Sequence, residues 1–241
     1  MVINILKVFG LGAVSFAVAM AIPPVLTNFL YRKKLWKKKV RQFAFAGAPT
    51  QIFGQLHKEK EVGTPRMGGI LIWATTATLV SILWLLASLF SIPLFDKLNF
   101  LSRSQTWLPL FTLLAASFIG LIDDVLQVTG RGGYVGGGMS FAKRVGLVIL
   151  IGLIGAWWFY FKLEVDSIFI PGVGDVIIGP LVMVLFVLTM LATFSGGVID
   201  GLDGLAGGVF AAIFAAFAGV AFFQDQIDLA AFLSVVIGGL L

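Results

Sequence analysis

The sequence has no cysteine, a single histidine and few charged residues, and these shortages exclude several classes of function. Without cysteine there is no disulfide framework and no thiolate chemistry. Charged residues make up 12% of the chain against 59% hydrophobic residues, and a mean hydropathy of +1.02 leaves little room for a soluble protein. The short alternating segments of a membrane barrel are also missing. We therefore expect an all-α polytopic membrane protein.

Apolar runs long enough to cross a bilayer, about 20 residues each, recur along the whole chain. We expect six full transmembrane helices and a partial seventh, at 2–30, 68–92, 107–122, 145–161, 179–194, 205–223 and 229–241. Pro23 and Pro24 predict a kink or an end in the first. Turn residues flanked by apolar segments predict a small β-hairpin near 167–178, on the outside.

The seventh run is too short for a full crossing, so we expect the chain to be a fragment or a truncated product. Residues 1–241 are interpreted as one transmembrane domain.

Basic residues predict the orientation in the membrane. Ten of the seventeen Lys and Arg side chains fall between Tyr31 and Arg66, which marks that loop as cytoplasmic by the positive-inside rule. Counting alternate crossings from there places the loops 31–67, 123–144 and 195–204 on the same face. Because the positive charge lies in loops between apolar spans, the net charge of +5 does not indicate a nucleic-acid partner.

Two adjacent carboxylates, Asp123 and Asp124, end the apolar run that begins at Trp107. Neighbouring acids repel each other, so we expect a cation or a basic partner to offset the repulsion. Mg²⁺ is the leading candidate because it takes hard oxygen ligands, typically one or two carboxylates plus substrate phosphates and waters. The alternative is that the pair merely ends a helix at the water interface.

A second acidic pair, Asp200 and Asp203, follows the span at 179–194. Their spacing places both on one face of a helical turn. The glycine-rich stretch 130–138 either brings backbone close to a phosphate or forms a flexible connector, and we favour the connector. Cations that a pyrophosphate donor would need lie on the same face, and each is alternatively a plain topology determinant: Lys58, Lys60, Arg66, Lys143 and Arg144.

Acids, cations and a glycine-rich loop on one membrane face fit a reaction between a soluble phosphorylated substrate and a lipid-borne one. Phosphoryl transfer depends largely on positioning and on charge neutralisation, with a metal between acidic protein groups and phosphate oxygens.

Three ordered motifs also carry a family resemblance: His57 to Gly69 with its Gly-Thr-Pro-Arg-Met-Gly-Gly end, Gly120-Leu-Ile-Asp-Asp124, and Asp200-Gly-Leu-Asp-Gly-Leu-Ala206. In order and spacing they resemble the polyprenyl-phosphate N-acetylhexosamine-1-phosphate transferases. Within that superfamily the sequence looks most like the phospho-N-acetylmuramoyl-pentapeptide transferases. The resemblance covers essentially the whole chain, as the N-terminal two-thirds of such an enzyme.

The resemblance implies Mg²⁺-dependent transfer of phospho-N-acetylmuramoyl-pentapeptide from UDP to undecaprenyl phosphate, with release of UMP, at the cytoplasmic face of the bacterial inner membrane. By motif position, Asp123 would deprotonate or orient the lipid phosphate, and Asp124 would help place metal and pyrophosphate. Asp203 would recognise the uridine, with Asp200 supporting the same pocket. The other implied substrate-binding residues are Lys58, Lys60, Thr64, Arg66 and Arg144.

The sequence departs from the family pattern at four positions. Gly197 replaces an asparagine, Glu61 replaces a lysine, Arg66 stands where the muramoyl enzymes commonly have threonine, and Gln127 replaces a lysine. The family's third essential aspartate, a metal ligand, and its histidine-rich loop would lie beyond Leu241.

Several alternatives remain open. The Pro-Arg-Met-Gly-Gly motif also occurs in relatives that transfer N-acetylglucosamine phosphate, and a truncated homologue could be inactive. A transporter would place acids along an ion path, but the spans carry almost no ionisable residue besides Lys7. An intramembrane aspartyl protease ranks lowest, because Asp175 is expected in an outside turn.

Small and aromatic residues suggest two surface features. The glycines in the span at 205–223 would permit close helix packing at an oligomer interface, such as a homodimer: Gly207, Gly208 and Gly219. Trp157, Trp158 and Tyr160 are interpreted as a belt at the membrane interface, where aromatic residues are enriched.

Overall fold

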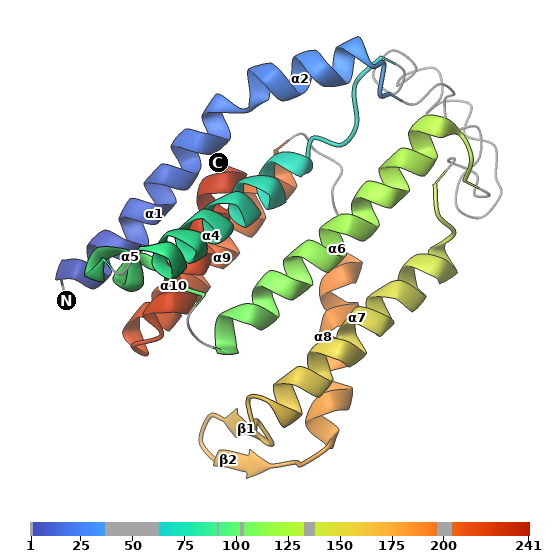
Figure 1. Ribbon diagram of the computed structural model, residues 1–241. Helices are drawn as coiled ribbons and strands as arrows, with labels where there is room; N and C mark the ends of the chain where they lie inside the picture. The colour runs from blue at the N-terminus through green and yellow to red at the C-terminus, as the bar shows by residue number, and fades with distance from the viewer. Residues whose placement is uncertain (1, 37–62, 91, 102–103, 133–137, 197–203) are drawn as a thin grey trace.

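The computed structural model describes residues 2–36, 63–90, 92–101, 104–132, 138–196 and 204–241. Helices dominate and run roughly along one direction as a bundle (Figure 1). They are α1 (Val2–Ala21), α2 (Pro23–Arg32), α4 (Ile70–Leu89), α5 (Pro93–Leu98), α6 (Ser104–Thr129), α7 (Phe141–Phe161), α8 (Leu181–Ser195), α9 (Leu205–Phe223) and α10 (Ile227–Leu240).

The helices confirm the predicted polytopic membrane fold. Five segments are long and apolar enough to cross a membrane, with α1 and α2 counted together over Val2–Arg32, and α8 and α10 are shorter apolar helices. The predicted interruption in the first span is also present. Helix α1 ends at Ala21 and α2 begins at Pro23, because a proline at the first helical position lacks only an amide that has no partner there.

Helix α6 corrects the expectation that the aspartate pair lies in the loop 123–144. The helix continues through both aspartates to Thr129, and α7 already begins at Phe141. The left-handed Gly130, with φ of 67°, ends α6, and the amide of Arg131 donates to the carbonyl of Leu126. A glycine in this conformation is a common helix stop, whereas aspartate is only moderately unfavourable inside a helix.

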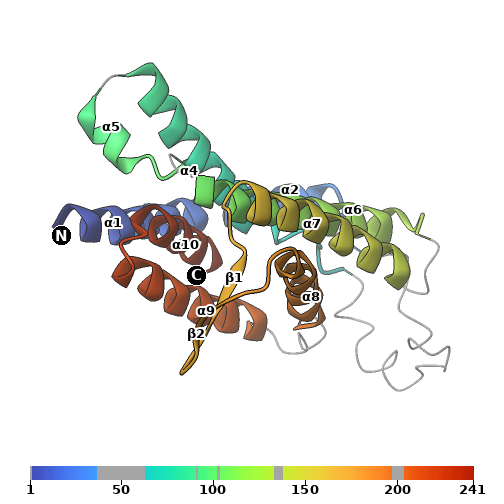
Figure 2. The ribbon, with the colours of Figure 1, turned by 90° about the horizontal axis from the view of Figure 1, so that it is seen from below.

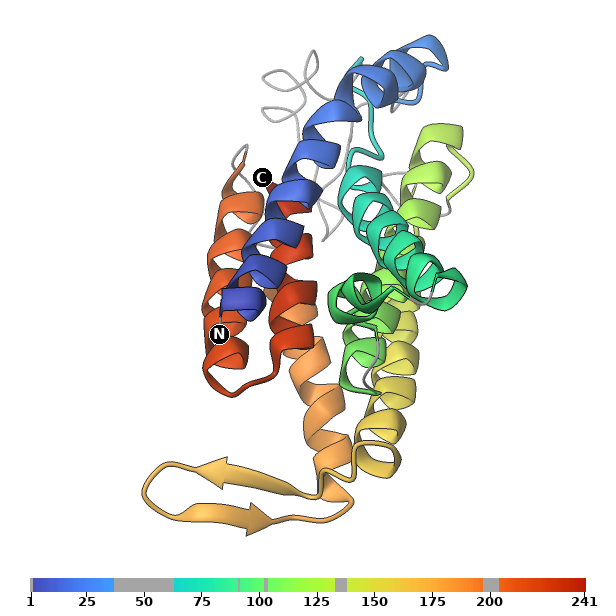
Figure 3. The same cartoon turned by 60° about the vertical axis from the view of Figure 1, so that its left-hand side comes forward.

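Helix packing divides the bundle into two groups. Helices α1, α9, α10 and α4 pack together, and α7 pairs with α8 (Figures 1 and 3). Helix α6 lies between the groups and contacts α4, α7 and α10. Ser15 on α1 donates to the carbonyl of Val235 on α10 over 2.6 Å, and a Cβ at Gly238 would lie 2.8 Å from the backbone nitrogen of Phe16. Small residues thus let α1 and α10 approach closely.

A buried ion pair also joins α1 to α10. The ammonium of Lys7 lies 2.7 Å from the Asp228 carboxylate and 3.3 Å from the carbonyl of Asn99. The sequence singles out Lys7 without indicating its partner, although charges inside membrane spans are nearly always paired.

The predicted hairpin is present at the end of the bundle opposite Asp123 and Asp124 (Figure 1). Strands β1 (Ser167–Ile170) and β2 (Gly174–Ile177) pair antiparallel, with Ser167 opposite Ile177 and Ile170 opposite Gly174. The expected turn 171–175 is slightly shorter, because β2 begins at Gly174.

Candidate active site

Asp123 is the most heavily bound carboxylate of the site. One guanidinium nitrogen of Arg144 lies 2.9 Å from Oδ1 and 2.8 Å from Oδ2. The backbone amide of Met139 donates to Oδ1 over 2.6 Å, and the Gln127 side-chain amide donates to Oδ2 over 2.7 Å. The side chain of Asp123 is 14% exposed. These charge-assisted hydrogen bonds hold it in one position.

Local chain geometry explains why these donors meet. Gln127 lies one helical turn after Asp123, so both project from the same face of α6. Arg144 lies in the first turn of α7, and Met139 comes just before that helix. A Cβ at Gly138 would lie 2.6 Å from Asp123 Oδ1 and 3.1 Å from the Arg144 guanidinium. Only glycine therefore allows the backbone to approach the aspartate this closely.

Asp124 faces a different set of groups. Arg66 and Arg144 act on its carboxylate electrostatically, the backbone of Met67 hydrogen-bonds to it, and the neighbouring Asp123 repels it. Asp124 is half-buried. Arg66 beside Asp124 and Arg144 beside Asp123 are basic partners of the kind that we expected for the adjacent carboxylates.

The segment before α4 places Arg66 and Met67. It is tied to the end of α2, because the amide of Arg66 donates to the carbonyl of Leu35 over 2.9 Å and Pro65 bridges to Trp36. Met67 has a left-handed φ of 73°, and its buried side chain packs beside Leu30 and Val128. A non-glycine residue in this conformation stores backbone strain, and such strain clusters at functional sites.

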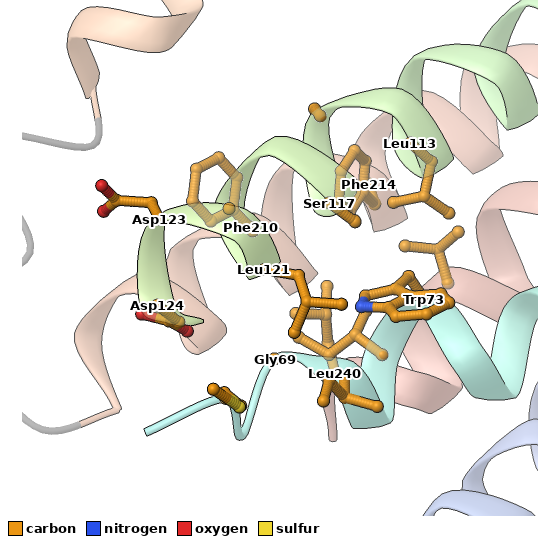
Figure 4. Close-up of a pocket in the computed structure, with 16 residues that line it drawn as sticks. Gly69, Trp73, Leu113, Ser117, Leu121, Asp123, Asp124, Phe210, Phe214 and Leu240 are labelled. Atoms are coloured by element: carbon orange, nitrogen blue, oxygen red, sulfur yellow. The ribbon is translucent and has the colours of Figure 1, made fainter. Parts of the chain in front are cut away.

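A pocket of about 600 Å³ runs from the aspartates into the bundle. Asp123 and Asp124 lie at one end of the view in Figure 4, and Trp73, Leu113 and Phe214 lie toward the other. Helices α4, α6, α9 and α10 and the segment just before α4 supply its walls, which are almost entirely apolar. Besides the aspartates, the lining residues are Met67, Gly69, Ile70, Ile72, Trp73, Leu113, Ala116, Ser117, Gly120, Leu121, Phe210, Phe214, Val236 and Leu240. The pocket is therefore amphipathic, with the carboxylates at one end and hydrocarbon along its length.

The other predicted site residues divide into two groups. Thr64 is exposed and is not among the residues that line the pocket, and its predicted role stays a prediction. Lys58, Lys60, Asp200 and Asp203 lie outside the described residues, and their predicted roles stay predictions.

Sequence reasoning missed two of the three donors that hold Asp123, the amide of Met139 and the side chain of Gln127. It named the third, Arg144, as a substrate-binding residue. Gly138 belongs to the glycine-rich stretch that we favoured as a connector, and there the close backbone approach is to a carboxylate. In the sequence, Gln127 stands out only as a departure from the family.

The carboxylate pair fits Mg²⁺ by donor chemistry. Asp123 and Asp124 supply the hard oxygen ligands that this ion prefers, and Mg²⁺ sites in proteins commonly use one or two carboxylates together with substrate phosphates. Among the described residues no further Asp, Glu or His joins them to form a three-ligand group. Arg144 would have to share Asp123 with the ion, because it now contacts both carboxylate oxygens.

Comparison with known proteins gives a consistent result. The chain is 28% identical over 232 residues to the phospho-N-acetylmuramoyl-pentapeptide-transferase of Listeria innocua, which covers 95% of this chain and 63% of the relative. The enzymes of the same name from Levilactobacillus brevis and Bacillus subtilis are each 30% identical, over 90% and 94% of this chain and 64% and 62% of their own lengths. The chain thus spans a little under two thirds of these relatives.

One protein family matches the chain from the first turn of α6 onward. The matched part includes the aspartate pair, α7 with Arg144, and the pocket walls from α9 and α10. The match covers residues 106–241, which are more than half of the sequence. The chain therefore belongs to glycosyl transferase family 4.

Proposed function

We propose that this chain transfers phospho-N-acetylmuramoyl-pentapeptide from its UDP carrier to undecaprenyl phosphate, forming a lipid intermediate of peptidoglycan synthesis and releasing UMP. The observation that carries the proposal is the amphipathic pocket, because a polyprenyl phosphate has the same division into a long apolar chain and an anionic head. The name shared by the relatives supports the choice of substrates.

Each part of the pocket has a task in this reaction. The apolar walls from α4, α6, α9 and α10 take the first part of the polyprenyl chain and exclude water from it. Arg66 and Arg144 bring positive charge to the aspartates at one end of the pocket, where the lipid phosphate meets the pyrophosphate of the donor. The Nε of Arg144 is buried without a hydrogen-bond partner among the described residues, so the guanidinium retains a donor for a substrate oxygen.

The chemistry is an exchange of one P–O–P linkage for another. An oxygen of the lipid phosphate forms a bond to the phosphorus attached to the sugar, and the bond between that phosphorus and UMP breaks. Asp123, fixed by Arg144 and Met139, orients the lipid phosphate and takes its proton if it arrives protonated. Mg²⁺, held by Asp123 and Asp124, would neutralise the charge of the phosphate groups.

We also propose that the aspartates face the cytoplasm of a bacterium, where UDP-linked donors are made. The concentration of Lys and Arg in residues 31–66 supports this orientation.

Release of UMP by the purified protein tests the proposal. The assay contains Mg²⁺, undecaprenyl phosphate and either UDP-N-acetylmuramoyl-pentapeptide or UDP-N-acetylglucosamine. We expect release with the muramoyl donor, and a loss of roughly 100-fold or more in Asp123→Asn, in the range for removal of an acid–base group. Chelation of Mg²⁺ should stop the reaction.

Asp225→Asn is the matched control, because Asp225 is an exposed aspartate in the turn between α9 and α10 and does not line the pocket. It should release UMP at the wild-type rate. Release with the N-acetylglucosamine donor alone would show that the assigned sugar is wrong. No release with either donor, from protein with intact helical circular dichroism, would contradict the proposed enzyme.

A further inference from the structure

The β1–β2 hairpin exposes an unusual amount of apolar side chain for a segment outside the membrane spans. Phe169 is 69% exposed, Val173 73% and Ile177 76%. The antiparallel register places Ser167 opposite Ile177 and Phe169 opposite Asp175. Phe169 and Ile177 therefore lie on the same face of the hairpin, since directly opposed residues and alternate residues share a face.

The direction of the hairpin relates this face to the membrane. Figure 3 shows the two strands leaving the bundle at a steep angle to the helix axes, at the end where α7 and α8 meet. In Figure 2, seen from below, the hairpin lies beside α8 and crosses in front of α9. Because the helices cross the bilayer, a hairpin in this direction runs along the bilayer surface.

Exposed apolar side chains also lie at the end of α7 and the start of α8, on either side of the hairpin in the sequence. Trp157 and Phe161, near the end of α7, are 47% and 57% exposed, and Leu181 at the start of α8 is 64% exposed. Exposed apolar residues on these spanning helices face lipid, and aromatic residues mark the depth of the headgroups. The hairpin leaves and rejoins the bundle between these residues, so it lies at the level of the membrane interface.

We propose that the hairpin binds the bilayer itself, with Phe169, Val173 and Ile177 inserted at the boundary between headgroups and acyl chains of the leaflet opposite the aspartate pair. Asp175 lies opposite Phe169 on the same face, so its carboxylate lies at the headgroup level of this boundary. The charged residues Lys162, Glu164 and Asp166 precede the hairpin and are at its base. The partner is phospholipid rather than a second copy of the chain. Two four-residue strands offer far less surface than the ~800 Å² per partner of a stable protein interface.

Spin labelling can test this inference directly, because the chain has no cysteine to remove. The variants Phe169→Cys, Val173→Cys and Ile177→Cys would each be labelled with a nitroxide in vesicles of phosphatidylethanolamine and phosphatidylglycerol. Collision with oxygen, which concentrates in lipid, is compared with collision with a water-soluble nickel complex. Leu188→Cys, exposed in the middle of α8, serves as the lipid reference, and Arg131→Cys, exposed after α6, serves as the water reference.

We expect the three hairpin labels to show an oxygen-to-nickel ratio well above that of the Arg131 label and shifted toward that of the Leu188 label. A ratio equal to that of the Arg131 label would mean that the hairpin stands in water, and it would overturn the inference. Low collision with both reagents, with spin–spin broadening between copies, would also overturn it, because a second copy would then cover the face. Neither readout depends on enzymatic activity.

Discussion

The carboxylate of Asp123 is held in one position by hydrogen bonds from its neighbours. Three donor groups, from α6, from the backbone before α7 and from α7 itself, meet at its two oxygens. Each donor comes from a different part of the chain, so the position of Asp123 reports on how α6 and α7 fit together. A Cβ at Gly138 would lie only 2.6 Å from Asp123 Oδ1, so substitution of Gly138 tests this packing most directly.

Gly138→Ala should impair the reaction without unfolding the protein. The added methyl group would lie 2.6 Å from Asp123 Oδ1 and 3.0 Å from Cγ of Gln127, so the aspartate must move. We expect the rate of UMP release to fall about tenfold, which corresponds to ~1.4 kcal/mol of barrier. The rate is measured with saturating Mg²⁺ and both substrates.

Gly146→Ala is the matched control, because Gly146 lies in α7 and a methyl group added there would have no neighbouring heavy atom within 4 Å. This variant should keep the wild-type rate. An unchanged rate in Gly138→Ala would show that the approach of the backbone to Asp123 has no part in catalysis.

At the scale of elements, α1 and α10 are held together by contacts between residues more than 200 positions apart. The Lys7–Asp228 ion pair lies near one end of this helix pair, and the hydrogen bond from Ser15 to Val235 lies further along it. Helices in a membrane gain little from hiding apolar surface from lipid, so close packing and polar contacts decide which helices associate. The ion pair is therefore expected to matter for the stability of this pair of helices.

Removing one partner of the ion pair should destabilise the protein strongly. Their side chains are 8% and 13% exposed, so Lys7→Met or Asp228→Leu removes the opposite charge from a buried ion, at a cost of about 3–5 kcal/mol. For a chain of this size, each kcal/mol lowers Tm by about 2–4 °C. Helical circular dichroism during heating in detergent measures the shift.

The double variant Lys7→Met/Asp228→Leu supplies the control, since it removes both charges. It should recover most of the stability lost in either single variant, because apolar replacement of a buried pair is often neutral. If the losses of the two single variants simply add in the double variant, the two charges do not interact.

At the scale of the whole molecule, the fold separates two ends with different tasks. The aspartates and the polar end of the pocket lie at one end, and the lipid-binding hairpin is proposed at the other (Figure 1). Arg131 lies just after α6 at the first end, and Asp175 lies in β2 at the second. Both side chains are exposed, so each can report on the side of the membrane that its end faces.

The proposed orientation predicts opposite labelling at these positions. In intact bacterial spheroplasts, Asp175→Cys should react with a membrane-impermeant maleimide, and Arg131→Cys should react only after the membrane is permeabilised. The unaltered chain is the blank, because it contains no cysteine. Reaction of Arg131→Cys in intact spheroplasts, with Asp175→Cys protected, would reverse the assigned topology.

The sequence was sufficient to predict the spans, the proline break and the hairpin. Apolar runs and turn residues are local signals, and the span at 205–223 has the observed bounds of α9. The end of α6 was misplaced, because we assigned the boundary to the two charges rather than to the left-handed Gly130. A Cβ added at Gly207, Gly208 or Gly219 of α9 would meet no heavy atom of the described chain within 4 Å, and the predicted homodimer stays a prediction.

The sequence by itself therefore determined the membrane class, the approximate spans, the family motifs and the aspartate pair as the candidate site. Only the tertiary structure decided that the amide of Met139 donates to Asp123 and that Gly138 lies close against it. It also decided that Lys7 pairs with Asp228 and that α1 packs on α10. The reason is physical. Apolar side chains that face lipid and those that face another helix are chemically alike, so a hydrophobic run predicts a span without indicating which helices it contacts.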